Sequence, residues 1–204
     1  MPNVKTTGKK SSNTLVRDLV NVGIFAALYF VLAFASSSIG YIPALIIFST
    51  GSISLVTSIP LFLFFLKIDR PIFCCLLFSS FFGCVMLMMG QSLLMLPIFV
   101  TVGVLTGFCL KILHKSFWGL FSANVSMSLL SSSMMLPLWL STEEYLAYAS
   151  GMSDEGYVAK MAELANSYWP LVAIFAFGIL GAVVGSFIAR RVMKKHFERI
   201  GLAQ

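Results

Sequence analysis

Apolar stretches of about twenty residues recur along the 204-residue chain, and they limit its possible folds more than any other feature. A helix of about twenty apolar residues is long enough to cross the roughly 30 Å hydrocarbon core of a bilayer. Charged residues make up only 11% of the chain, whereas soluble domains carry about 25%. The sequence therefore predicts an integral membrane protein of the all-α class.

Six transmembrane helices account for these stretches, and short polar breaks such as "KIDRP", "MMGQS" and "KILHKS" separate several of them. The predicted spans cover residues 19–36, 42–66, 71–89, 93–113, 117–140 and 169–189. A segment at 1–18 precedes this six-helix domain of residues 19–189, and a basic tail at 190–204 follows it. The first apolar run is full length and lacks a clear cleavage site, so we expect a retained span rather than a secretory signal.

The cations predict the orientation of the bundle. An even number of spans places both termini on one side, and 13 of the 14 Lys and Arg residues then lie on that side. Only Lys160 lies on the other. By the positive-inside rule, both termini are expected in the cytoplasm, with the basic tail near the anionic lipids of the inner leaflet. No nucleic-acid-binding motif accompanies the tail, so we expect no nucleic-acid partner.

The loop at 141–168 is the one long connection on the expected outer side. It carries five acids against Lys160, together with several aromatic residues. The stretch "SDEG" offers an N-cap with acids in the first turn for a short helix over about 154–166. A loop of this length is either a solvated connection or a lid over a binding site, and the tyrosines favour a lid or a segment that lies at the interface.

Signatures of an energy source or of catalysis are missing from the sequence. It contains no GxxxxGK[ST], HExxH or GxSxG motif, and neither His114 nor His196 lies on the expected outer side. No ionisable residue falls within the core of a predicted span, which argues against a proton-coupled carrier. The four cysteines lack metal-ligand spacing. We therefore expect no catalytic residue, no metal and no resident cofactor, and a non-enzymatic protein.

Two of the predicted spans carry small residues at helical spacing. The first span has Gly23 and Ala27, a pair that permits close approach of another helix. The last span has a longer series on one face, comprising Gly178, Gly181, Ala182, Gly185 and Ala189. For the last span we expect contact with other helices of the same chain. For the first span, internal packing and a partner contact remain equally open.

Three stretches carry a resemblance to a known family: "RDLVNVGIFAALYFVLAF" (17–34), "GYIPALI" (40–46) and "MKKHFERIGL" (193–202). With the six spans, the chain resembles the substrate-binding S components of energy-coupling-factor (ECF) transporters, and more narrowly the Trep_Strep integral membrane proteins of prokaryotes. The resemblance implies a multi-pass protein of the plasma membrane. It also implies three partners, a transmembrane coupling protein (T component) and two cytoplasmic ATPases. Transport would proceed as the S component topples in the membrane.

The same resemblance implies where the partner and the substrate bind. Gly23 and Ala27 match the AxxxA-like docking pattern of the family, with glycine in place of the first alanine. The substrate, a vitamin or a metal- or haem-type cofactor, would sit near the outer surface under loops. Methionines and a few polar or aromatic residues gather there, and the predicted substrate-binding residues are Tyr41, Met88, Met89, Gln91, Met135, Trp139, Asn166 and Trp169. Asn124 is a weaker candidate. Two alternatives remain open: a self-sufficient small transporter or channel, and a membrane adaptor protein.

Overall fold

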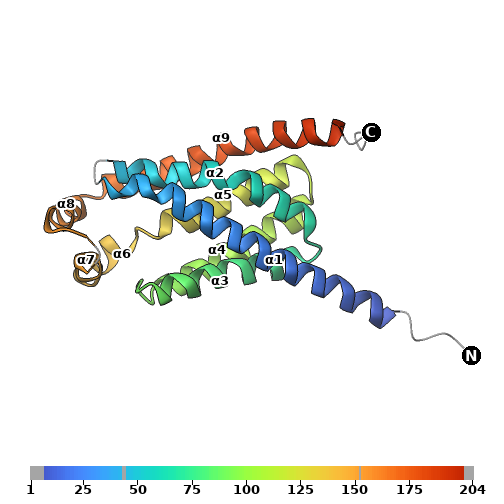
Figure 1. Ribbon diagram of the computed structural model, residues 1–204, viewed down its shortest axis with the longest axis horizontal. Coiled ribbons are helices and arrows are strands. Elements are labelled where there is room, and N and C mark those ends of the chain that lie inside the picture. The colour runs from blue at the N-terminus through green and yellow to red at the C-terminus, as the bar shows by residue number, and fades with distance from the viewer. Residues whose placement is uncertain (1–6, 43–44, 152, 200–204) are drawn as a thin grey trace, which may run out of the picture.

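A bundle of six long helices makes up most of the protein (Figure 1). The computed structural model describes residues 7–42, 45–151 and 153–199, and it is helical without strands over these residues. The long helices are α1 (Thr7–Ser37), α2 (Ile46–Lys67), α3 (Pro71–Met88), α4 (Met95–Leu113), α5 (Phe117–Ser133) and α9 (Trp169–Arg199). The all-α prediction is confirmed for the described part of the chain.

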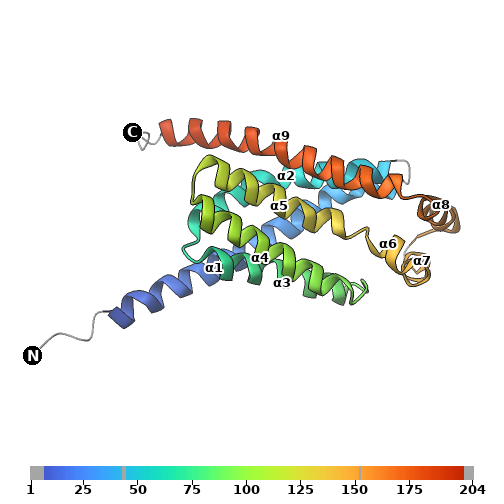
Figure 2. The same ribbon diagram turned by 180° about the vertical axis from the view of Figure 1, so that it is seen from behind.

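The four short helices gather at one end of the bundle. They are η1 (Ser38–Tyr41), α6 (Pro137–Leu140), α7 (Thr142–Ser150) and α8 (Glu155–Ala165). Helices α6, α7 and α8 project beyond the bundle and are called the cap below. Helix α1 begins and α9 ends at the opposite end, as the two opposed views show (Figures 1 and 2). That end is called the termini end.

Five of the helices are long and apolar enough to cross a bilayer, as judged by length and composition over the described residues. These candidate spans are Thr14–Gly40, Ile46–Lys67, Pro71–Met88, Met95–Leu113 and Trp169–Lys194. Helix α5 differs because its 17 residues reach about 26 Å at 1.5 Å per residue. It is also rich in serine and largely buried among the other helices.

The predicted continuous span over 117–140 is wrong. Helix α5 ends at Ser133, and a turn over residues 134–136 leads into α6. Pro137 supplies the reason, because it lacks the N–H that would continue the helical ladder and instead starts α6. The outermost helices also extend further than the predicted spans. Helix α1 begins at Thr7, and α9 runs ten residues past Ala189 to Arg199.

Aromatic side chains fill the centre of the bundle between α1, α2, α3 and α4. The Tyr29 ring lies edge-on to Phe78 and Phe82, with ring centroids 5.4 and 5.3 Å apart. Phe64 packs on Phe78 from α2, and Phe99 packs on Phe82 from α4. All five side chains are buried. This cluster holds α1 against the hairpin formed by α3 and α4.

Small residues bring α9 against α2 and α5. A Cβ atom added to Gly181 would lie 2.1 Å from the carbonyl oxygen of Gly51, so the two backbones are in direct contact. A Cβ at Gly178 or Gly185 would meet the hydroxyl of Ser132 or Ser58 at 2.2 Å. The expectation that the last span packs within the chain is confirmed.

Asn124 of α5 joins three helices inside the bundle. Its side-chain nitrogen donates towards Ser58 Oγ of α2 at 2.8 Å. It also lies within donor distance of Ser186 Oγ at 3.0 Å and the Ala182 carbonyl oxygen at 3.1 Å, both on α9. The residue is buried. Asn124 therefore does not line an outer site, as the sequence had led us to consider, but supports the packing of α2, α5 and α9.

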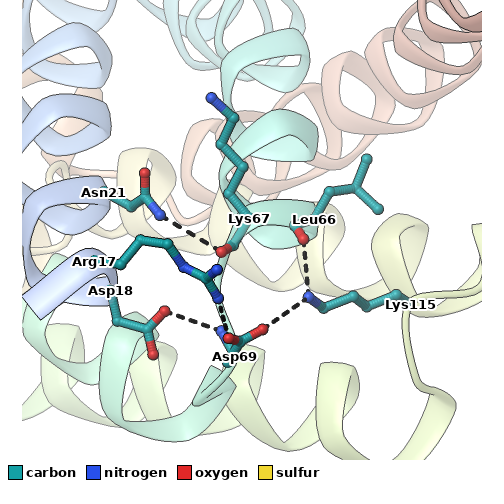
Figure 3. Close-up of polar contacts among 7 residues, drawn as sticks. All are labelled: Arg17, Asp18, Asn21, Leu66, Lys67, Asp69 and Lys115. Atoms are coloured by element: carbon teal, nitrogen blue, oxygen red, sulfur yellow. Dashed lines mark hydrogen bonds and ion pairs between the residues drawn. The ribbon is translucent and has the colours of Figure 1, made fainter. Parts of the chain in front are cut away.

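The connections at the termini end carry a group of charged side chains (Figure 3). Arg17 of α1 pairs with Asp69 in the α2–α3 connection. Lys115 of the α4–α5 connection approaches the other oxygen of Asp69 at 3.8 Å and donates to the Leu66 carbonyl oxygen at 2.8 Å. Asp18 is buried and accepts a hydrogen bond from the Asp69 backbone N–H at 3.1 Å. These contacts tie α1 to the α2–α3 connection, which Lys115 joins to the α4–α5 connection.

Candidate functional site

A cavity of about 240 Å³ lies where the bundle meets the cap, and it is called the cap cavity below. Helices α1 and η1 contribute Phe34, Ser37 and Gly40 to its wall. The first turns of α2 contribute another side, and the C-terminal ends of α3 and α5 a third. Helices α7 and α8 close the cavity with Tyr145, Tyr148 and Tyr157. The site therefore combines residues that lie far apart in the sequence, from Phe34 to Tyr157.

Much of the wall is apolar and polarisable. Four methionines line the cavity, namely Met86, Met89, Met134 and Met135. A narrower apolar pocket of about 40 Å³ shares Met86, Met134 and Phe34 with the cavity and extends towards the buried rings of Tyr29 and Phe82. Methionine adapts its shape and contacts aromatic rings favourably. Such a wall suits the body of an organic ligand.

Three serines and the threonine of the wall bond to main-chain carbonyl groups. Ser49 Oγ donates to the Ile46 carbonyl oxygen at 2.7 Å, and Ser37 Oγ donates to that of Phe34 at 2.7 Å. Thr50 Oγ1 reaches across to Ile174 of α9 at 2.9 Å. In α5, Ser128, Ser131 and Ser133 bond to carbonyl groups of their own helix.

The cap forms because its sequence supplies the signals that start short helices. The stretch "SDEG" starts α8, and Asp154 is its N-cap: the Asp154 carboxylate accepts a hydrogen bond from the Tyr157 backbone N–H at 2.7 Å. The apolar sides of α7 and α8 bury Tyr145, Ala149 and Met161 against Ile46 of α2. These residues form a hydrophobic cluster separate from the core of the bundle. The long loop is thus a folded cap over the cavity.

Burial raises the pKa of the Tyr145 phenol above its ordinary value near 10, so this side chain stays neutral at physiological pH. The same hydroxyl points at the sulfur of Met135, with 3.7 Å between the two atoms. Tyr145 therefore links α7 to the turn that follows α5. This contact holds the cap to the wall of the cavity.

A shallower pocket adjoins the cavity and carries an acid. Gln91, Tyr145 and Tyr148 line both spaces, and Glu144 lines the pocket. Ser92 Oγ donates to Glu144 Oε2 at 3.2 Å. Beside them Gly90 adopts a φ of +93°, and a Cβ there would come within 3.0 Å of the Tyr148 ring. Glycine is suited to this turn because L side chains rarely adopt such a backbone.

Three of the eight predicted substrate-binding residues meet at the cap cavity, namely Met89, Gln91 and Met135. Four others lie elsewhere. Met88 is 89% exposed and Trp169 is 62% exposed. Asn166 is exposed at the end of α8, and Trp139 donates its ring N–H to the Ser167 carbonyl oxygen at 2.8 Å, which anchors α6 to the chain after α8. The side chain of Tyr41 lies outside the described residues.

Sequence reasoning missed most of the polar wall. The tyrosines of the cap were noticed as signs of a lid but were not assigned to the site, and Ser49 and Thr50 of α2 were not considered. The available signal was the density of hydroxyl groups in the first half of α2, "STGSISLVTS", which is unusual for a span.

The predicted docking pair on α1 faces outward. Gly23 and Ala27 are exposed, and a Cβ added to Gly23 would meet nothing within 4 Å. Apolar residues surround the pair on the same exposed surface, including Val20, Ile24 and Val31. Of the two readings left open for this pair, packing within the chain is excluded. Gly23 and Ala27 remain available to lipid or to another helix.

Comparison with known proteins places most of the chain in one family. Residues 16–199 match a protein family described as "Hypothetical bacterial integral membrane protein (Trep_Strep)". No curated protein and no solved structure matches the chain.

Proposed function

This chain belongs to the Trep_Strep family of bacterial integral membrane proteins, and from that premise we propose that it is the substrate-binding S component of an ECF-type importer. It would bind a micronutrient, either a vitamin or a metal- or haem-type cofactor, in the cap cavity. The observation that carries the proposal is a cavity of about 240 Å³ under a folded cap, in a bundle whose described membrane helices carry their charges at the termini end.

The distribution of charge favours a subunit that binds substrate without driving its transport. Helices α3 and α5 contain no Asp, Glu, Lys or Arg. In α2 and α4 the only such residues are Lys67 and Lys111, both in the last turn. Ionisable groups within spans usually mark the proton or ion pathways of carriers. We therefore assign the energy source to separate subunits, namely a T component and two cytoplasmic ATPases.

The positions of the charges also support the orientation of the proposed S component. Lys67 ends α2 at the termini end, and the described connections there carry Arg70 and Lys115, whereas the cap carries Lys160 among several acids. With the termini end in the cytoplasm, the positive-inside rule is satisfied. The cap cavity then opens towards the outside, where an importer must collect its substrate. In this orientation α5 is the sixth span, although it is shorter and more polar than the rest.

The exposed small residues of α1 are proposed as the docking site for the T component. Small residues allow helix backbones to approach closely in a membrane, where van der Waals packing drives association. Gly23 and Ala27 meet this requirement. The exposed residues around them are apolar, and a Cβ added to Gly23 would meet nothing within 4 Å. After docking, the S component would topple and deliver its substrate to the cytoplasmic side.

Co-purification from the native bacterium tests the proposal. A tagged chain should bring down one membrane coupling protein and two ATPases. Ala27→Leu and Gly23→Leu should abolish this recovery, because a bulky side chain prevents close helix contact. Ala176→Leu is the matched control, since Ala176 is also small and exposed but lies on α9. Recovery of the chain alone would reject the importer assignment and favour a self-sufficient transporter or channel. Recovery of a soluble partner through the basic tail would favour an adaptor.

A further inference from the structure

Five hydroxyl groups on the wall of the cap cavity, those of Ser37, Ser49, Thr50, Ser131 and Tyr145, act as acceptors towards a ligand. A carbonyl oxygen has no proton, so each hydroxyl that bonds to one must donate its own. Ser37, Ser49 and Ser131 donate to carbonyl groups three residues earlier, and Thr50 donates to Ile174. Tyr145 directs its proton at the Met135 sulfur. The oxygen atoms keep lone pairs, which a ligand can use only by donating.

The helix ends at the cavity reinforce this preference. Residues near the C-terminal ends of α1, α3, α5 and α7 line the wall, whereas α2 and α8 present their N-terminal ends. A helix C-terminus carries a partial negative charge of about half a unit and an N-terminus the opposite. Four C-terminal ends against two N-terminal ends give the cavity a net negative character.

The charged side chains near the cavity also favour a cationic ligand. None of the described residues that line the cap cavity is charged, and Glu144 lies in the adjoining pocket. Gln91 supplies an amide that can donate, but one neutral amide does not offset the loss of water around a carboxylate. The rings of Tyr145, Tyr148 and Tyr157 offer faces that attract organic cations.

We propose that the cap cavity selects a small aromatic amine, bound as its protonated cation, and rejects a carboxylate of the same size. The flat body lies among the methionines and the tyrosine rings. The ammonium group donates to hydroxyl oxygens and faces the Glu144 side of the cavity. This proposal rests on the substrate-binding role assigned above and deepens it by naming the class of ligand.

A matched series of three compounds tests the charge preference on the full chain in nanodiscs. Tryptamine, tryptophol and indole-3-propionate share an indole ring and a two-carbon arm, and end in an amine, an alcohol and a carboxylate. Isothermal titration at pH 7 should give the tightest binding for tryptamine, at least tenfold tighter than for indole-3-propionate, with tryptophol between them. Binding of the carboxylate as tight as that of the amine, or no binding of the amine, overturns the proposal.

Two variants assign the preference to this site. Glu144→Gln should reduce the ratio of tryptamine to tryptophol affinity several-fold, because tryptophol carries no charge for Glu144 to attract. Glu163→Gln is the control, since Glu163 is an exposed acid of α8 that does not line the cavity. A ratio that does not fall in Glu144→Gln overturns the assignment. These ratios are measured on the isolated chain, so their failure is distinct from a failure to recover the coupling subunits.

Discussion

Gly181→Ala tests the backbone contact between α2 and α9. The added Cβ would lie 2.1 Å from the Gly51 carbonyl oxygen and 2.8 Å from its carbon, whereas ordinary contacts begin at 3.4 Å. Helix α9 must therefore move away by about 1.3 Å, the difference between these distances. No flexible side chain can absorb the movement, because the atoms in contact belong to the backbone.

The stability lost in Gly181→Ala follows from two opposing effects. Overpacking a core costs about 1–3 kcal/mol, and a rigid backbone contact places Gly181→Ala near the upper value. Alanine favours the helix over glycine by about 1 kcal/mol. The variant should therefore lose about 2 kcal/mol, equivalent to a Tm about 4–8 °C lower for a chain of this size.

Thermal denaturation in detergent, followed by circular dichroism, measures this loss. Gly23→Ala is the matched control, because its Cβ enters open space and gains helix propensity without a clash. Its Tm should equal or exceed that of the native protein. If Gly181→Ala melts at or above the native temperature, the inferred contact between α2 and α9 is refuted.

Five further substitutions at four positions examine other parts of the molecule. Asn124→Asp should destabilise the bundle more than Asn124→Ala. The hydroxyl groups of Ser58 and Ser186 already donate their protons to their own helices, so their oxygen atoms would face the oxygen atoms of the new carboxyl group. Thermal melting of both variants gives the comparison. The raised pKa of Tyr145 means that the folded state disfavours the phenolate. The contribution of neutral Tyr145 to stability is therefore complete below the pKa near 10 of the unfolded chain. It is lost as the pH rises through the higher pKa of Tyr145 in the folded state. Tm should fall more steeply above pH 10 in the native protein than in Tyr145→Phe, and equal slopes would contradict this. Asp18→Ala should cost about 1–3 kcal/mol, because the acceptor of the Asp69 N–H is fully buried. Asp69→Ala should lower the free energy of unfolding by at most about 1 kcal/mol, because the ion pairs of Asp69 are about half exposed. Chemical denaturation measures both losses, and a larger loss for Asp69→Ala than for Asp18→Ala would contradict this prediction.

The parts of the fold that sequence predicted well depend on local patterns. The stretch "SDEG" marked the start of α8, and the small residues from Gly178 to Ala189 share one face of a long helix. Both patterns are visible without knowledge of the tertiary structure. The break after Ser133 was missed because residues 134–140 are as apolar as the helix before them, so hydropathy gives no sign of the end. Pro137 was the one local signal.

The candidate site was harder to predict because its residues come together only through packing. Met88 and Met89 are adjacent, yet the first is exposed and the second lines the cavity. Helix α3 ends between them, and no periodic pattern extends through the turn that follows. Trp139 and Trp169 are of a residue type that often stacks on ligands, but neither lines the cavity. Ser49 and Thr50 escaped notice because hydroxyl groups within a span usually bond to their own helix.

Separate hydrophobic clusters in the cap and the bundle imply two cooperative units rather than one. A unit with few buried contacts opens at a lower free energy than the rest of a protein. Amide protons of residues 142–165 should therefore exchange with solvent deuterium sooner than those of α2 and α3. The frequency of that local opening would set an upper limit on how fast any solute can enter or leave the space beneath.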